Sequence, residues 1–462
     1  MGFMIYFKAG ARIIFTSVLI FIFCISCSLN LEKIATLEKQ SGADIRAECV
    51  LCDITYKTDN YYIAVIRIDK SDRLPKGTRI TAFYEPLSMD IGDSFIADIK
   101  VKPIADTSYK AQSYSDSVYL QGSLSNITPT DNDDLPLKFV GKIRNYIKTT
   151  LMEHLEYKKA ATICALIFGE RGYFTNEFSD CVAAAGVSHV MVVSGMHLAI
   201  MVSFITKIME RIFYNRFVKA LLMVGVVLFL SLLCGFTMSI LRAGVTYLIM
   251  AVGLMLDRKG KAENSLGGAI TLILISSPFA FFNISFKLSV LSTFAILVFA
   301  LPLINKLQEK FRFKFIVKYA VTTAVFSLSA YIFTLPVTIY YFGCISVVSV
   351  ISNLLISQVV TWALYCAFTC LVLNLIVPFA IDLLFIPLSI LTEYINFAIS
   401  YMGSLPFAVI EVDKYWGYIS IFVILFVLLL LASCKKRSNM LKLKLMNEKI
   451  VKEGGGNLKW HR

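Results

Sequence analysis

The stretch SHVMVVSGMHLAIMVSF, residues 188–204, places two of the chain's four histidines, together with a serine and a glycine, inside a long apolar run. Such a run predicts a membrane-spanning helix. Polar side chains within a bilayer cost free energy unless they meet partners or water. We therefore expect His189, Ser194 and His197 to face the interior of a helical bundle.

The composition supports a membrane location. Hydrophobic residues make up 57% of the chain and charged residues 17%, and the mean hydropathy is +0.69. These values are far from those of soluble domains and predict an integral membrane protein. The net charge of +13 is accounted for first by basic loops on the cytoplasmic side of the membrane.

The number of apolar segments predicts a polytopic α-helical protein with about ten transmembrane helices. A first segment, 13–29, follows basic residues and predicts an uncleaved anchor, with a signal peptide as the alternative. The loops that a cytoplasmic N-terminus would place inside are basic, so both termini are predicted to be cytoplasmic. The other predicted spans are 188–207, 217–235, 237–256, 264–282, 286–304, 319–341, 346–374, 375–402 and 417–433.

The region 30–130 has a different pattern. Alternating runs such as YYIAVIRID, residues 61–69, predict strands. They indicate a small inserted β domain of five strands, outside the cytoplasm, for which a barrel is one economical closure. Cys49 and Cys52 form a lone C-x-x-C, which predicts a local disulfide or buried thiols rather than a metal site, because a second pair at ligand spacing is missing.

The next region, 131–160, predicts an amphipathic helix. Phe139, Ile143, Ile147 and Leu151 recur every fourth residue and would form one face. Such a helix lies on a membrane surface or caps a domain, and the pattern fits both.

The polar residues of 188–204 admit several interpretations. His189 and His197 lie about 12 Å apart along a helix, too far to share a metal ion. Ser194 and His197 are i, i+3 neighbours, which raises the hypothesis of an intramembrane hydrolase, although no acidic residue nearby would orient the histidine. The remaining readings are polar contacts that tie helices together, with Gly195 permitting close approach, or a polar-lined conduit.

Further polar residues recur in the apolar segments downstream. Ser239, Arg242, Ser289 and Asn353 all lie within predicted spans. An arginine inside such a span must pair, reach the interface, or line an aqueous path for an anionic substrate. Lys287 lies nearer the end of its helix, where its side chain is expected to reach the interface.

The chain resembles ComEC-type competence proteins in four ordered blocks. Residues 165–204, ALIFGERGYFTNEFSDCVAAAGVSHVMVVSGMHLAIMVSF, resemble the family's G-[DE]-R stretch and the A-G-x-x-H-x-x-x-x-S-G-x-H helix after it. GFTMSILRAGV, SSPFAFFNISFKLSVLSTFAIL and LPVTIYYFGCISVVSVISNLL are similar to the three later blocks. In the first block the G-[DE]-R stretch corresponds to Gly169, Glu170 and Arg171.

The resemblance implies a multi-pass channel in the bacterial cytoplasmic membrane that passes single-stranded DNA inward during natural transformation. It implies an OB-like fold for 30–130, a competence-type channel domain over 161–433 and a basic cytoplasmic tail over 434–462. No catalytic residue, metal or cofactor is expected. The residues that it assigns to the channel lining or its support are His189, Ser194, Gly195, His197, Ser239, Arg242, Ser289 and Asn353.

The resemblance also implies partners. Many relatives continue into a metallo-β-lactamase-like nuclease domain, for which this sequence has no H-x-H-x-D-H cluster, so a nuclease is expected on a separate protein. A Walker loop is also missing, so an ATP-driven DNA translocase is expected in the cytoplasm. A DNA receptor, membrane lipid and self-association are further expected partners. The alternative function is a transporter or flippase for another anionic substrate on the same scaffold.

Overall fold

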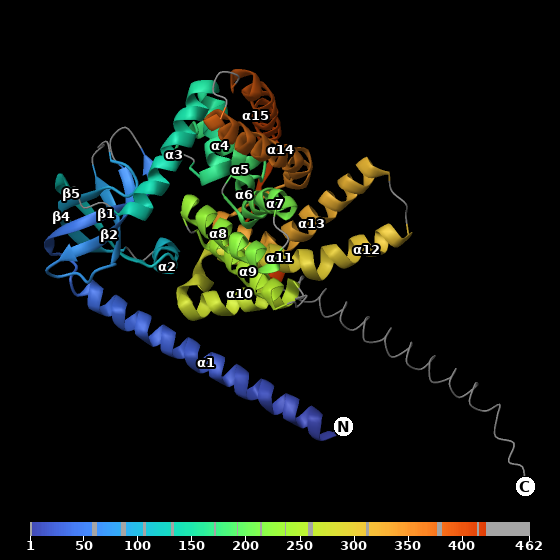
Figure 1. Ribbon diagram of the computed structural model, residues 1–462. Coiled ribbons are helices and arrows are strands. Elements are labelled where there is room, and N and C mark those ends of the chain that lie inside the picture. The colour runs from blue at the N-terminus through green and yellow to red at the C-terminus, as the bar shows by residue number, and fades with distance from the viewer. Residues whose placement is uncertain are drawn as a thin grey trace, which may run out of the picture.

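The computed structural model describes residues 2–57, 62–84, 89–104, 108–130, 134–170, 172–191, 193–212, 215–235, 237–256, 262–310, 314–376, 381–413 and 415–421. They form a small β barrel, a larger helical body beside it, and a long N-terminal helix, α1, that extends away from both (Figure 1). Most of the predicted span 417–433 and all of the basic tail lie outside the described residues.

Helix α1, Gly2–Glu38, is longer than the anchor predicted at 13–29. The Ser26 hydroxyl donates to the Ile275 carbonyl, 2.6 Å away in the helical body. Near the end of the helix, Asn30 accepts a hydrogen bond from Tyr119 of the barrel, and Leu37 is buried in the barrel's core. The helix therefore contacts both parts of the molecule.

Five strands close into a barrel, which confirms the predicted strand number and closure. The order around the barrel is β1-β2-β3-β5-β4, and β4 pairs again with β1. The contact between β3 and β5 is parallel and the other four are antiparallel. The bounds are β1 Asp44–Lys57, β2 Tyr62–Ser71, β3 Arg79–Tyr84, β4 Ser94–Pro103 and β5 Val118–Thr130, with helix α2, Ser108–Ser115, before β5.

The alternating apolar and polar residues of the sequence correspond to side chains that point alternately into and out of the barrel. In β2, Ala64, Ile66 and Ile68 are fully buried and their neighbours are partly exposed, as expected when successive side chains point to opposite faces. Cys49 lies in this core, and burial raises the pKa of its thiol to about 12. Cys49 and Cys52 are both free thiols, the first buried and the second partly buried, so the predicted disulfide is absent and the alternative of buried thiols holds for Cys49.

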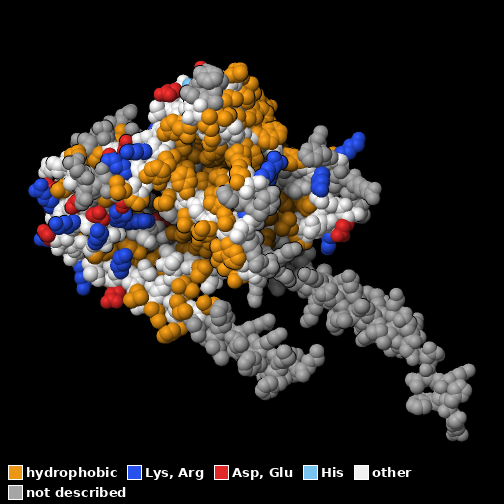
Figure 2. All heavy atoms as spheres, viewed as in Figure 1, with side chains coloured by type: hydrophobic (Ala, Val, Ile, Leu, Met, Phe, Trp, Pro, Cys, Tyr) orange, Lys and Arg blue, Asp and Glu red, His pale blue; other side chains and the backbone are white. Residues whose placement is uncertain are grey.

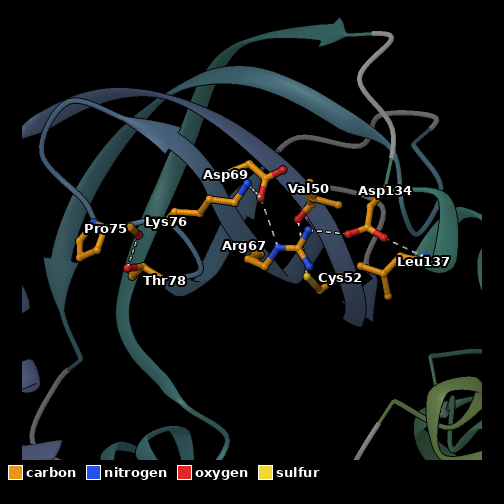
Figure 3. Close-up of polar contacts among 9 residues, drawn as sticks. All are labelled: Val50, Cys52, Arg67, Asp69, Pro75, Lys76, Thr78, Asp134 and Leu137. Carbon is orange, nitrogen blue, oxygen red and sulfur yellow. Dashed lines mark hydrogen bonds and ion pairs between the residues drawn. The ribbon is translucent and has the colours of Figure 1, made fainter. Parts of the chain in front are cut away.

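Helix α3, Leu135–His154, attaches to the barrel at its first turn. Asp134 caps the helix by accepting from the Leu137 N–H, and its other carboxylate oxygen accepts from Arg67 of β2 (Figure 3). A hydrogen bond from the Arg67 side chain holds the pKa of Asp134 below its usual value, against the opposing effect of burial. The ion pair therefore joins the barrel wall to the start of the helix.

Two glycines bring α3 and the barrel into direct backbone contact. A Cβ on Gly92 would lie 2.2 Å from the backbone nitrogen of Lys138. A Cβ on Gly141 would lie 2.3 Å from the Ile91 carbonyl oxygen. Gly92 also has φ +95, a conformation that other residues adopt only at a cost. No side chain fits at either position without separating the two elements.

The buried face of α3 differs from the predicted one. Ile147 and Leu151 are buried as expected, but Phe139 is 60% exposed. Arg144, which does not belong to the predicted apolar face, is 6% exposed. The buried face of α3 is therefore rotated relative to the predicted one. It includes Arg144 and Thr150 as well as apolar residues.

The helical body follows α3. Its helices are α4 Tyr157–Phe168, α5 Asn176–Ala184, α6 Ser188–Met191, α7 Gly195–Ile212, α8 Arg216–Leu233, α9 Met238–Met255, α10 Ala262–Ser276, η1 Pro278–Phe282, α11 Ile284–Ala295, η2 Ile296–Ala300, α12 Leu301–Lys310, α13 Phe315–Phe342, α14 Ser349–Ile376 and α15 Ile381–Gly403. Two short strands, β6 Cys344–Ser346 after α13 and β7 Val409–Glu411 after α15, pair with each other in antiparallel orientation.

Two of the predicted spans are wrong as continuous helices. The run from Ser188 is broken between α6 and α7. Val193 and Ser194 are not helical, and α7 begins at Gly195. The span 264–282 is broken after Ser276, and Ser277 is extended. Pro278 disfavours the helical conformation in the residue before it.

Five helices among the described residues are long and apolar enough to cross a membrane. Four shorter apolar helices lie within 195–276, so the number ten stays a prediction. Hydrophobic side chains dominate the visible surface of the helical body, whereas charged ones gather on the barrel (Figure 2). This division fits a membrane protein with one polar domain.

Candidate functional site

The serine and the second histidine of 188–204 lie together at the start of α7. The Ser194 carbonyl accepts the Leu198 N–H, which makes Ser194 the N-cap residue. Its hydroxyl accepts from the Met196 N–H at 3.3 Å. In return, His197 Nδ1 accepts from the Ser194 N–H at 3.2 Å. This is a reciprocal capping box in which histidine takes the place of glutamate or glutamine.

The capping box fixes the state of His197. The Ser194 hydroxyl also lies 3.0 Å from Nδ1, so that nitrogen accepts both hydrogen bonds and the proton of the neutral ring is on Nε2. The ring is fully buried, and Nε2 has no hydrogen-bond partner among the described residues. The predicted contact between Ser194 and His197 is present, and helix capping accounts for its geometry.

Gly195 allows α9 to approach the first turn of α7. A Cβ at this position would lie 2.8 Å from Nη2 of Arg242 and 3.1 Å from Cβ of Ala243. The Gly195 N–H donates to the Ser239 hydroxyl at 3.4 Å. The S-G-x-H motif therefore combines a cap with a close helix contact.

Ser239, Arg242 and Ser289 form one polar group beside this contact. The two serine hydroxyls lie 3.1 Å apart, and Arg242 Nε donates to the Ser289 hydroxyl at 2.8 Å. Arg242 is 7% exposed. Across the described ranges, no acidic side chain forms an ion pair with Arg242.

The helix dipoles oppose the charge of Arg242. Arg242 lies in the first turns of α9 and beside the first residue of α7, where the helix N-termini carry partial positive charge. A buried cation in such a place is costly unless an anion compensates it. We call the group Ser239, Arg242 and Ser289, together with Gly195, the Arg242 cluster.

Other predicted residues lie outside the Arg242 cluster. Asn353 of α14 donates to the Ser327 hydroxyl of α13 and so ties two different helices together. His189 lies in α6 with an exposed side chain. Gly169 is the left-handed C-cap of α4, and a Cβ there would contact Val193. Arg171 lies outside the described residues.

The sequence did not predict the contacts of Arg144. The Arg144 guanidinium donates to the Leu233 carbonyl at 2.7 Å and to Asp53 of β1 at 3.0 Å. It also lies 3.8 Å from Glu170, the central residue of the G-E-R stretch. Arg144 thus joins the barrel, α3, α8 and the G-E-R stretch. The sequence feature that could have indicated these contacts is the position of Arg144, directly after Ile143 of the predicted apolar face.

The comparison with protein-family models places these residues in a known family. The model of the competence protein family matches residues 166–437. That segment includes the capping box, the Arg242 cluster and the G-E-R stretch. No solved structure matches the chain.

Three curated proteins show similarity. ComE operon protein 3 of Bacillus subtilis (strain 168) is 23% identical over 256 residues, 54% of this chain and 32% of that protein. Uncharacterized protein MG316 homolog of Mycoplasma pneumoniae is 37% identical over 111 residues, 24% of this chain and 28% of that protein. Uncharacterized protein MG316 of Mycoplasma genitalium is 29% identical over 174 residues, 37% of this chain and 42% of that protein.

These alignments span less than half the length of each relative. The family model, in contrast, covers more than half of this chain. The chain belongs to the competence protein family.

Proposed function

We propose that this protein passes single-stranded DNA across the bacterial cytoplasmic membrane during competence, as a multi-pass channel. The observation that carries the proposal is Arg242, a buried guanidinium without an acidic partner among the described residues, set beside the N-termini of two helices. A DNA strand brings one negative charge with each nucleotide. Its phosphates would supply the missing anion at this position.

The two serine hydroxyls beside Arg242 are suited to a DNA strand that moves past them. Ser239 and Ser289 offer hydroxyls that exchange between each other and a passing phosphate oxygen. One cation rather than many keeps each phosphate weakly held, and conduction requires that a bound group leaves again. In this proposal Gly195, Ser194 and His197 support the lining, because the capping box holds the first turn of α7 against Arg242.

The barrel takes the receiving role in the proposal. We propose that it is OB-like and lies outside the cytoplasm, where it would meet the incoming strand. The support is its five strands in one barrel and the parallel pairing of β3 with β5, since the OB-fold is a five-stranded barrel that binds oligonucleotides. A receptor, a separate nuclease and a cytoplasmic ATP-driven translocase complete the proposed pathway.

The test is import of labelled DNA in the native competent host. The strains carry wild type, a deletion, Arg242→Gln and Arg242→Lys, at matched abundance in the membrane. Loss of one charge-assisted hydrogen bond corresponds to roughly 1.5–3 kcal/mol, so Arg242→Gln should lower import by about tenfold to a hundredfold. Arg242→Lys keeps the charge and should retain part of the import.

The outcomes separate the proposal from its alternative. If the deletion strain imports DNA normally, the proposal fails. Flux of another anionic substrate that depends on Arg242 would then favour the transporter or flippase. The hydrolase hypothesis predicts labelling of Ser194 by a serine-reactive probe, and loss of the label in Ser194→Ala.

A further inference from the structure

A second cation of the helical body is held among aromatic rings. Lys287, in the first turn of α11, donates from Nζ to the Tyr341 hydroxyl at 2.8 Å. The same Nζ lies 5.1 Å from the centre of the Tyr341 ring, 5.8 Å from that of Phe281 and 6.0 Å from that of Phe282. The Lys287 ammonium therefore lies among three aromatic rings near the start of its helix.

The two phenylalanines around this lysine are exposed. Phe281 is 57% exposed and Phe282 is 51% exposed. Their ring centres lie 5.6 Å apart and their planes meet at 88°. Because the rings are perpendicular, they cannot stack on each other.

Two tyrosines extend the same surface. Tyr340 is 48% exposed and contacts Tyr341 with ring centres 5.0 Å apart. Tyr418, 49% exposed, lies 5.9 Å from Tyr340. We call this set the aromatic patch; its members are Phe281, Phe282, Tyr340, Tyr341 and Tyr418, around Lys287.

Two elements that carry the patch, η1 and α11, also contact the barrel's helix α2 and the Arg242 cluster. Its 3₁₀ helix η1 packs on the barrel's helix α2, where the rings of Phe279 and Tyr114 are 5.5 Å apart. Helix α11 carries both Lys287 and Ser289, the hydroxyl that binds Arg242. Two residues along a helix correspond to about 3 Å of rise and about 200° of rotation, so Lys287 and Ser289 leave α11 on different sides.

We propose that the aromatic patch binds single-stranded DNA by stacking its bases on Phe281 and Phe282, while Lys287 attracts the adjoining phosphate. The inference rests on the proposed function and adds a second point of contact to it. Proteins that bind single strands without reading their sequence combine exposed aromatic rings with nearby cations, as this patch does. The positive charge of Lys287 favours single-stranded DNA over an uncharged apolar partner.

The test measures binding of two probes to the purified full chain in phosphatidylcholine nanodiscs. One probe is a short fluorescent oligothymidylate, and the other is an abasic oligomer with the same number of phosphates. The variants are the double change Phe281→Leu with Phe282→Leu, and Lys287→Gln. Phe397→Leu is the matched control, because Phe397 is 67% exposed on α15 and belongs to another ring pair.

The double variant should weaken oligothymidylate binding by at least about fivefold, the lower limit of the loss expected for a single stacked base. Its affinity for the abasic oligomer should not change. Lys287→Gln should weaken both probes, and Phe397→Leu neither. Leucine keeps the surface apolar, so a role limited to the membrane interface would leave oligothymidylate binding unchanged in the double variant.

Three results would overturn the inference. They are equal affinity of wild type for the two probes, unchanged oligothymidylate binding in the double variant, or an equal loss in Phe397→Leu. Failure of the proposed function has a different signature, since Arg242→Gln would then import DNA like wild type. Stacking at the patch would still be measurable in that case.

Discussion

Among the described residues, two arginines are buried, and their surroundings differ. Arg144, between the barrel and the helical body, has two carboxylates within 4 Å and donates to a main-chain carbonyl. Arg242, inside the helical body, donates to a serine hydroxyl, and no carboxylate of the described residues lies within ion-pair distance. One charge is neutralised by the protein and the other is not.

The difference indicates two kinds of role. A buried ion pair with good geometry joins elements, because removal of one partner leaves the other charge unpaired. A buried cation without an acidic partner lowers stability, and the function proposed above gives it a partner, the phosphate of a passing strand. Arg144 joins the barrel to the helical body through these contacts, and we propose that Arg242 serves a substrate.

The largest expected effect lies at the barrel contact. Gly92→Ala should destabilise the barrel by about 3 kcal/mol or more, from overpacking and from a left-handed backbone. Hydrogen exchange of the barrel strands in the full chain measures this change. Gly77→Ala is the control, because Gly77 has φ +84 but no atom within 4 Å of its Cβ position, and it should cost about 1 kcal/mol. Equal losses in both variants would refute the close contact.

The two arginines should respond differently to loss of charge. Arg144→Met should destabilise the protein by about 2 kcal/mol, because Asp53 and Glu170 lose their partner. Arg242→Met should change stability by less than about 1 kcal/mol, or raise it, because no carboxylate is left unpaired. Thermal unfolding in detergent compares the two. If Arg242→Met is the more destabilising variant, the assignment of roles is wrong.

The capping box predicts a rescue. His197→Ala should destabilise α7 by about 1–2 kcal/mol, since the Ser194 N–H loses its acceptor. His197→Gln should recover most of this stability, because glutamine at the same position closes the box. Thermal unfolding and hydrogen exchange at the start of α7 measure both variants. If glutamine restores stability but not DNA import, the histidine has a second role.

The smallest effect concerns the barrel core at alkaline pH. The pKa of Cys49 is about 12 in the fold, against 9.0 for a free thiol. The unfolded chain therefore loses this proton first, and stability falls as pH rises above about 9, by about 1 kcal/mol at pH 10. Cys49→Ala should lose stability less steeply over the same range. Identical slopes for the two proteins would show that Cys49 is not the responsible group.

The sequence predicted the local parts of the site well. The alternation in 30–130 predicted the five strands, since side-chain direction in a strand depends only on position, and the barrel that was one possible closure is the one that forms. The i, i+3 spacing predicted that Ser194 and His197 touch. It did not predict the break before Ser194, because the flanking residues are apolar and the serine functions as a cap only where the chain turns.

The sequence by itself determined the membrane character, the strands of 30–130 and the polar motif, because each depends on neighbours along the chain; closure of the barrel depends on the pairing of β1 with β4 and of β3 with β5. Only the tertiary structure decided which arginine is neutralised. Arg144 and its partner Asp53 are 91 residues apart, and Ser289 reaches Arg242 from a different helix. Charge compensation depends on distance in space, which packing of the barrel against α3 and of α9 against α7 and α11 sets.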